Sequence, residues 1–588
     1  MPSEIHSTDS TRTSSEPQPN SSLQAHSTSA QGGEQSRTTS SGQAKQCVDC
    51  QKDFLISDNE LGMYEKVGVI LPGQCFFCRS QQQFAFWNFG KFRKGVSALS
   101  GQNLITVLPV KTRYPVYTAK EWFSDAWEPV SMGYDPKRPF LDQLKELQEK
   151  IPRPHQTGEN SINCDWCDDV WESKNCYLSR ALANCEEVSY GYRVVRIKDS
   201  LDLTYCYDSE RSYDCTYCFN CFNVHYAFNC RNAIDSKFLF DCRNVQNCFM
   251  CWNLRGKQYC ILNQQYTKEE YFQKLGAYRF GSWQVVQELK SEWEQHIREE
   301  AVHRENFNVK VADSVGNYLT NCNRCVDAFH WEDSENCYNV MRGLKSKDLI
   351  DVTGSWQIES TGNSADMVGG YGMKYSMWCL HCRYSEYLDL CWDCEYCFGC
   401  VGIRKKRYTI LNKQYPKEEY EKLRDQIIQS MKDDGSYGKF FPYDMALSGY
   451  NTSNAQIYFP ETKEKVLARG GFWDEVDESK LEGLSTAELP DDISEVEDGI
   501  TTQALICPQT GYRFNIAPQE LNFYRQYSIP LPRLHFDARS LNRFKPLLVI
   551  EPTSYHCVCC KKEIQAYYPP EWGYKKVACE SCYSKEIA

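Results

Sequence analysis

The cysteines in the middle of the chain are spaced by multiples of three residues. Thirteen cysteines lie between Cys164 and Cys260, and nine more lie between Cys322 and Cys400. Within each block every spacing is a multiple of three, whereas chance would distribute the cysteines over three registers. We therefore expect a repeating fold in which every third residue has an equivalent environment.

A longer period overlies this spacing, because segments that begin at Cys176, Ile197, Cys218, Leu239 and Cys260 superpose every 21 residues. The other positions of the register hold Ser, Ala, Val and Leu, which are small enough for a narrow interior. A unit this short must stack on its neighbours to bury an apolar face. The sequence therefore predicts a mainly β fold, a β-solenoid (β-helix) with one 21-residue repeat per coil. The interior pattern resembles that of the small insect antifreeze β-helices, but the Thr-Cys-Thr face that binds ice is absent.

The repeat block is duplicated. Residues 242–251 match residues 391–400 at a constant offset of 149, and the match continues through both exits. Each exit leads to a Lys-Glu-Glu-Tyr motif, at Lys268 and at Lys417, which predicts a helix that caps the open end of a coil. A longer apolar stripe, with Val286 and Leu289, predicts a helix that bridges the two solenoids. Plain packing of reduced thiols explains the interior cysteines, with disulfides, clusters or stored soft metal as the alternative.

Both ends of the chain carry paired CxxC motifs. Two residues between thiolates let one turn direct both sulfurs at an ion, and two such turns complete the tetrahedron that Zn²⁺ prefers. Four thiolates leave no open position, so the sites are predicted to be structural, with about two zinc ions in all and iron as the alternative metal. Cys559 is either a bystander or an alternative ligand. The predicted metal ligands are Cys47, Cys50, Cys75, Cys78, Cys557, Cys560, Cys579 and Cys582.

Each intact CxxC pair has a degenerate copy at the other end of the chain. In the copy of the first site, Cys507 is kept and Thr510, His535 and Ala538 replace the other ligands. In the copy of the second site, Ser97, Ser100, Ala119 and Trp122 replace all four sulfurs. We expect these copies to bind zinc poorly or not at all, so that each terminus holds one intact and one degenerate zinc ribbon.

These observations divide the chain into two solenoids that are joined by helices and flanked by zinc-ribbon modules. The predicted segments are a disordered tail (1–45), an N-terminal ribbon pair (46–125), a helical linker (126–153), solenoid copy 1 (154–265), a helical bridge (266–308), solenoid copy 2 (309–412), a capping helix (413–435), an irregular acidic linker (436–500) and a C-terminal ribbon pair (501–588).

Charge and composition narrow the possible functions. The net charge is −12, and residues 474–498 hold eleven acidic side chains against one lysine, which disfavours general binding to a polyanion. No hydrophobic signal segment or membrane span is evident, so we expect the chain in the cytoplasm, where thiols remain reduced. We find no glycine-rich phosphate loop, nucleophile elbow or histidine pair at metal-ligand spacing, and no small-molecule substrate is evident.

The chain resembles an uncharacterised family of Cys-rich zinc-ribbon and repeat proteins from reduced-genome candidate-phylum bacteria. The resemblance covers nearly everything beyond the tail and implies the architecture, but no activity. It is carried by residues 175–178, 237–243, 253–263, 440–442, 449–451, 523–525 and 531–533.

The sequence is thus interpreted as a non-catalytic, zinc-binding scaffold or interaction protein whose ribbons contact an unidentified protein or RNA partner. Three alternatives remain open. Ribbons with lysines and aromatic side chains suit an RNA- or ribosome-associated factor, and the many thiols suit a thiol or soft-metal store. Aromatic columns such as Tyr207, Phe228 and Phe249 suit a β-helical glycan-binding protein or enzyme.

Overall fold

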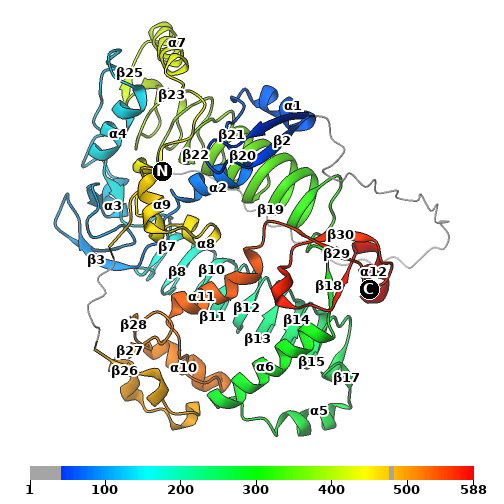
Figure 1. The fold of residues 1–588 in the computed structure, drawn as a ribbon. Coiled ribbons are helices and arrows are strands. Elements are labelled where there is room, and N and C mark those ends of the chain that lie inside the picture. Colours follow the sequence, from blue (N-terminus) through cyan, green and yellow to red (C-terminus); the bar gives the residue numbers. More distant parts are fainter. Residues whose placement is uncertain (1–41, 476–481, 588) are drawn as a thin grey trace, which may run out of the picture.

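The computed structural model describes residues 42–475 and 482–587 (Figure 1). The predicted tail therefore lies outside the described residues, except for positions 42–45. Two ladders of mainly parallel strands form the centre of the molecule. Ladder 1 (residues 162–265) contains β7 (Cys167–Trp171), β8 (Ser179–Ala183), β9 (Glu186–Ser189), β10 (Tyr192–Val195), β11 (Lys198–Thr204), β12 (Tyr213–Thr216), β13 (Phe222–Phe228), β14 (Arg231–Phe240), β15 (Arg243–Trp252), β16 (Gln258–Ile261) and β17 (Gln264–Gln265). Ladder 2 (residues 309–414) contains β19 (Val315–Leu344), β20 (Lys347–Trp356), β21 (Glu359–Val368), β22 (Met377–Leu380), β23 (Glu395–Phe398), β24 (Arg407–Ile410) and β25 (Lys413–Gln414).

The parallel strands pair at a register of twelve residues. Cys167 pairs with Ser179 in ladder 1, and Cys337 pairs with Leu349 in ladder 2. The bridge from Val309 to Thr320 at the start of ladder 2 is one residue shorter. The predicted 21-residue coil is therefore wrong. Both 21 and 12 are multiples of three, so an inward residue at every third position does not distinguish between them.

The twelve-residue register arises from a left-handed residue before each inward position. Asn163, Asn175 and Glu187 all have φ of 54°, and each directly precedes an inward side chain. Four such three-residue steps complete one twelve-residue turn of a ladder, which we call a rung. Asn and Asp tolerate this conformation better than other non-glycine residues. Their side chains also join successive rungs, as where the Asn163 amide donates to the Asn175 oxygen at 2.9 Å.

Small side chains fill the interior of both ladders. All 22 cysteines of the ladders are buried and unpaired, which confirms that they face inward. Their thiols donate to nearby carbonyls, as Cys206 Sγ does to Thr204 O at 3.5 Å. Serine serves in the same positions, and the Ser179 hydroxyl also accepts the Gly191 N–H at 2.9 Å. Backbone groups between rungs thus satisfy the polar atoms of these inward side chains.

Both ladders end in the same way. In ladder 1, β17 folds back antiparallel on β16 and α5 (Lys268–Leu275) follows, with a capping box between Thr267 and Glu270. In ladder 2, β25 folds back on β24 and α7 (Lys417–Asp433) follows. The antiparallel hairpin and its helix cover an edge that could otherwise pair with another chain.

Four small modules flank the ladders. Module N1 (residues 42–92) contains β1 (Gly42–Gln46), β2 (Asp53–Ser57), α1 (Asp58–Val67) and α2 (Phe76–Phe84). Module N2 (residues 93–123) contains β3 (Arg93–Val96), β4 (Asn103–Thr106), β5 (Val116–Tyr117) and α3 (Ala119–Trp122). Module C1 (residues 505–547) contains β27 (Leu505–Ile506), β28 (Arg513–Phe514), α10 (Pro518–Tyr527) and α11 (Phe536–Phe544). Module C2 (residues 553–587) contains β29 (Thr553–His556), β30 (Glu563–Ala566), β31 (Lys576–Ala578) and α12 (Glu580–Ile587). Positions 42–45 were predicted to belong to the tail, but they form β1 because their backbone pairs with β2.

The modules cross over between the ladders. N1 precedes ladder 1 in the sequence but packs on ladder 2, whereas C1 packs on ladder 1; Figure 1 shows α1 beside β20 and β21, and α11 beside β10 and β11. Two helices outside the modules follow the same rule, because each packs on the ladder other than the one that comes next in the sequence. In α4 (Phe140–Lys150), Phe140 packs against Phe398 of ladder 2, and α6 (Trp283–Glu299) packs against β14 of ladder 1.

The crossed arrangement is internally symmetric. Ladder 2 follows ladder 1 by 149 positions, as Asp351 follows Asp202, and the C modules follow the N modules by 460 positions, as Arg539 follows Arg79. Two short parallel pairs are related by both offsets. Strand β5 pairs with β6 (Arg153–Pro154), and β31, 460 positions after β5, pairs with β18 (Val302–Arg304), 149 positions after β6. The chain therefore forms two equivalent halves: ladder 2 with the N-terminal modules, and ladder 1 with the C-terminal modules.

Three predicted connecting segments are packed parts of the fold. Helix α6 was predicted to bridge the ladders, but it lies along ladder 1 with Val286 and Leu289 buried, because its stripe matches that surface. Residues 126–153 contain α4, which is docked on ladder 2. Residues 436–500 were predicted to be an irregular acidic linker, yet Phe440 and Phe441 are buried beside ladder 2. This segment contains η1 (Tyr443–Met445), η2 (Tyr450–Thr452), α8 (Asn454–Tyr458), α9 (Lys463–Ala468), β26 (Leu484–Ser485), η3 (Thr486–Glu488), η4 (Ile493–Glu495) and η5 (Asp498–Thr502), and its positions 476–481 lie outside the described residues.

The predicted aromatic columns also change with the register. Aromatic side chains stack at twelve-residue spacing, as Phe228 does on Phe240 with ring centroids 5.9 Å apart. Phe249, which lies off the inward register and was predicted either to support covering segments or to present a binding surface, is fully buried beneath Tyr278 and Phe280. These rings therefore form supports under the covering segments.

Candidate metal centres

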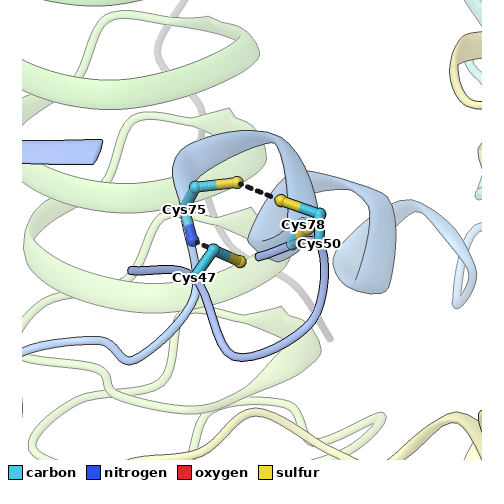
Figure 2. Close-up of side chains that lie close together, drawn as sticks. All are labelled: Cys47, Cys50, Cys75 and Cys78. Carbon is cyan, nitrogen blue, oxygen red and sulfur yellow. Dashed lines mark hydrogen bonds between the residues drawn. The ribbon is translucent and has the colours of Figure 1, made fainter. Parts of the chain in front are cut away.

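Module N1 brings four cysteine sulfurs together (Figure 2). The turn after β1 holds Cys47 and Cys50, and its Cys47 N–H donates to Lys52 O at 2.9 Å. Cys75 is the N-cap of α2, and Cys78 lies in the first turn of that helix. The Cys75 N–H donates to Cys47 Sγ at 3.2 Å, and Cys50 Sγ lies 3.8 Å from Cys75 Sγ. All four sulfurs lie within 4.8 Å of one another.

Module C2 repeats this geometry with Cys557, Cys560, Cys579 and Cys582. The Cys557 N–H donates to Lys562 O at 2.8 Å, and the Cys579 N–H donates to Cys557 Sγ at 3.4 Å. Its four sulfurs also lie within 4.8 Å of one another. Cys559 is exposed and outside this group. Over residues 42–475 and 482–587 no other three His, Cys, Asp or Glu side chains gather in this way, so the interior thiols of the ladders form no comparable cluster.

In each group the surroundings favour the thiolate of one cysteine, whereas hydrogen bonding with Cys75 and burial raise the pKa of Cys78, and hydrogen bonding with Cys579 raises that of Cys582. Hydrogen bonding from Cys78 lowers the pKa of Cys75 to about 5. In C2, burial opposes ionisation, but backbone N–H groups of Cys560 and Cys579 lower the pKa of Cys557 to about 6. The thiolate is the form that binds metal. Four soft donors at this spacing fit a tetrahedral ion such as Zn²⁺ and leave no position for water or substrate.

In module N2 a carboxylate joins the positions where metal ligands stand in C2. Ser97, which is the counterpart of Cys557, donates its hydroxyl to Glu121 Oε2 at 2.6 Å. The Thr118 N–H donates to the same oxygen at 2.9 Å. Hydrogen bonds from Ser100 and Ser97 lower the pKa of Glu121 to about 2. A charged side chain thus connects the loop and the helix that a metal would connect in C2.

Replacing Glu121 with glutamine should loosen module N2. A carboxyl whose folded pKa is lowered stabilises the fold fully above its unfolded pKa of about 4.3, and this contribution disappears as the pH falls through about 2. At pH 7 we therefore expect faster amide hydrogen exchange across residues 97–123 in Glu121→Gln, read by mass spectrometry. Glu128→Gln, at an exposed position, is the matched control. Equal exchange in both variants would contradict the structural role of Glu121.

In module C1, two residues at positions that correspond to metal ligands of N1 have other roles or no donor atom. His535, the counterpart of Cys75, caps α11 by accepting the Asp537 N–H on Nδ1 at 3.1 Å. Burial lowers the pKa of His535 to about 4, so the ring is neutral near pH 7. Ala538 offers no ligand atom. C1 therefore keeps the hairpin and helices of N1 without a complete set of donors.

Buried ion pairs, which no sequence motif predicted, hold the modules on the ladders. Arg79 of N1 contacts Asp351 at 2.6 Å, and Tyr64 Oη donates to the same carboxylate at 2.5 Å. In the other half, Arg539 and Arg543 of C1 contact Asp202 at 3.0 and 2.9 Å. The two offsets relate Asp351 to Asp202 and Arg79 to Arg539 in the sequence, but they do not indicate which arginine pairs with which aspartate.

No protein-family model matches the chain, and no curated protein matches it. Within the parts of the chain that the structure describes, no helix combines the length and the apolar character needed to span a bilayer.

Proposed function

We propose that this protein is a non-catalytic zinc-binding scaffold that acts by holding a partner. Each ladder is then a β-solenoid with twelve residues per coil, and modules N1 and C2 are zinc ribbons. The observation that carries the proposal is the pair of four-cysteine groups with equivalent geometry at opposite ends of the chain. Closed thiolate sites of this kind stabilise folds, and they activate neither water nor substrate.

The rest of the fold supports a rigid role. The ladders have interiors of small inward side chains, and the modules dock on them through buried pairs such as Arg79 with Asp351. Reduced thiols in such numbers fit a reducing compartment, and we place the protein in the cytoplasm. A soft-metal store is disfavoured because the ladder thiols donate to backbone carbonyls, as Cys230 does to Phe228 O at 3.5 Å.

Metal analysis of single variants tests this proposal. We expect the purified chain to hold two zinc ions, measured by inductively coupled plasma mass spectrometry. Cys75→Ser and Cys579→Ser should each hold one ion, because each removes one ligand of a different group. Cys559→Ser is the matched control and should keep two. Loss of neither ion, or many more than two ions per wild-type chain, would refute the assignment.

A further inference from the structure

One cleft stands open along helix α6. It has a volume of about 670 Å³ and lies between α6, ladder 1 and module C1, with Tyr574 of C2 at its edge. Tyr226 and Phe228 of ladder 1, Trp293 of α6 and Asn542 of α11 line it. The volume and the aromatic lining are those of a binding site.

The equivalent place in the other half of the molecule is filled by the chain itself. Residues 438–446 occupy it, between α4, ladder 2 and module N1. The two places correspond position by position under the two offsets. Tyr226, Phe228, Trp293, Asn542 and Tyr574 of the open cleft stand where Tyr375, Met377, Leu144, Gln82 and Tyr114 stand in the filled one.

The filling segment is held by its aromatic side chains and its carbonyls. Phe440 and Phe441 pack against Phe86 with ring centroids 5.4 and 6.1 Å apart. The Gln82 amide donates to Phe441 O at 2.8 Å, and the Tyr114 hydroxyl donates to Met445 O at 3.3 Å. These contacts recognise backbone and aromatic surface.

One charged contact completes the filled groove. Lys145 of α4 contacts the Asp444 carboxylate at 2.6 Å. This ion pair depends on a single side chain of the segment, and it therefore distinguishes one peptide sequence from another.

The open cleft keeps the same kinds of donors without hydrogen-bond partners. Asn542 supplies an amide in place of Gln82, and Tyr574 supplies a hydroxyl in place of Tyr114. Over the described residues, neither group makes a hydrogen bond, and the buried Trp293 Nε1 also has no partner. Asn542 is exposed and Tyr574 is half-buried, so water can satisfy both groups in the free protein. An unsatisfied buried donor such as Trp293 Nε1 is rare in folded proteins, and a ligand that offers a carbonyl oxygen would satisfy it.

The charge at one position is reversed. Glu294 of the open cleft stands where Lys145 contacts Asp444 in the filled one. A peptide in the open cleft should therefore carry a neutral or basic residue at the position that corresponds to Asp444.

We propose that the open cleft binds an extended peptide segment of a partner protein. The segment presents two adjacent aromatic side chains towards Pro546, which stands where Phe86 stands in the filled groove, and its carbonyls to Asn542, Tyr574 and Trp293. The inference rests on the proposed scaffold function and names the surface and the chemistry of the partner.

Six basic side chains also line the cleft, and three of them, Lys290, Arg539 and Arg543, are paired with carboxylates of the fold. The position-by-position match to the groove that residues 438–446 fill is the reason to favour a peptide, and the oligouridine competition below tests the nucleic-acid alternative.

A labelled peptide with the sequence of residues 436–450 provides the probe, because the groove that this segment fills is already occupied in the intact protein. Binding to the full zinc-loaded chain is measured by fluorescence anisotropy. Asn542→Trp should fill the cleft and weaken binding at least tenfold. The matched control is Gln565→Trp, at an exposed position of C2 that does not line the cleft, and it should bind like the wild type.

A charge exchange tests the alignment of the peptide. The wild-type cleft should prefer a peptide with the Asp444→Lys change over the unmodified peptide by about three- to fivefold, the effect of a half-exposed ion pair. Glu294→Lys should reverse that preference, because it restores the arrangement of Lys145 and Asp444. Independence of the two changes would contradict the equivalence of the two grooves.

The remaining outcomes each overturn the proposal. Two concern the peptide itself: the absence of saturable binding of both peptides, and binding by Asn542→Trp equal to that of the wild type. Two concern another occupant: displacement of the peptide by a twelve-nucleotide oligouridine that itself binds the cleft, and occupation of the cleft by a second copy of the chain, seen as a dimer in sedimentation. A normal content of two zinc ions in the same sample separates failure of this inference from failure of the scaffold assignment.

Discussion

Gly343→Val should destabilise ladder 2 by about 3 kcal/mol, at the upper end of the cost of overpacking a core. A Cβ atom at Gly343 would lie 2.4 Å from the ring of Trp331 and 2.6 Å from the hydroxyl of Ser355. Trp331 is fully buried one rung below, so its ring has no free space to enter. Urea unfolding followed by circular dichroism measures the loss.

The equivalent position in ladder 1 supplies the rescue. Leu182 and Val194 stand there in place of Trp331 and Gly343. Trp331→Leu alone should cost about 2 to 3 kcal/mol through the cavity that it leaves. The double variant Trp331→Leu, Gly343→Val should be more stable than either single variant, because it reproduces the packing of ladder 1. A double variant no better than Gly343→Val would contradict the equivalence of the ladders.

Arg79→Ala should lower the free energy of unfolding by about 3 to 5 kcal/mol, as expected when one partner of a buried ion pair is removed. Asp351 would keep the hydrogen bond from Tyr64 but lose the guanidinium in a site where burial already raises its pKa. We expect module N1 to separate from ladder 2. Faster hydrogen exchange in α1 and β20 would report this separation, and denaturant unfolding would report the energy.

Two controls isolate the charge. Arg79→Met with Asp351→Leu removes both ions and should recover most of the loss, since apolar replacements of buried pairs are often neutral. Arg138→Ala removes an exposed arginine, paired with Glu146 at 2.9 Å, and should change stability by less than about 1 kcal/mol. If Arg79→Ala behaves like Arg138→Ala, the docking contact is not structural.

The local spacing of cysteines predicted the interior but not the length of a rung. A residue that faces inward at every third position is a property of each three-residue step, so it is visible in the sequence. The length of a rung depends on how many steps return the chain to the same column. The missed signal is Asn or Asp directly before an inward residue, as in Asn163-Cys164 and Asn175-Cys176, where the left-handed residues stack every twelve positions.

The crossed docking of modules on ladders lay beyond the reach of sequence patterns. Arg79 and Asp351 are separated by more than 250 residues, and neither position has a local pattern that names its partner. Two constant offsets relate the halves, yet they leave open whether a module packs on the nearer or the farther ladder. Only the packed surfaces decide this, as when Trp87 of N1 lies against Gly354 of ladder 2.

The two four-cysteine groups that could hold a metal were predictable because each is built from two local turns. A CxxC turn and a second CxxC at a helix start define the ligands without distant contacts. The role of Glu121 in N2 was not predicted, because a single acid between degenerate positions has no recognisable pattern. The open cleft was missed as well, since its lining comes from ladder 1, α6, C1 and C2 together.

Mapping of reactive thiols tests the central claim most directly, namely that ladder cysteines fill an interior while the terminal groups bind metal. The zinc-loaded chain is treated with iodoacetamide under native conditions and analysed by peptide mass spectrometry. The account predicts rapid labelling of exposed Cys559 and protection of all 22 ladder cysteines until denaturant is added. Labelling of ladder cysteines such as Cys206 or Cys391 in the native chain, at the rate seen after unfolding, would contradict it.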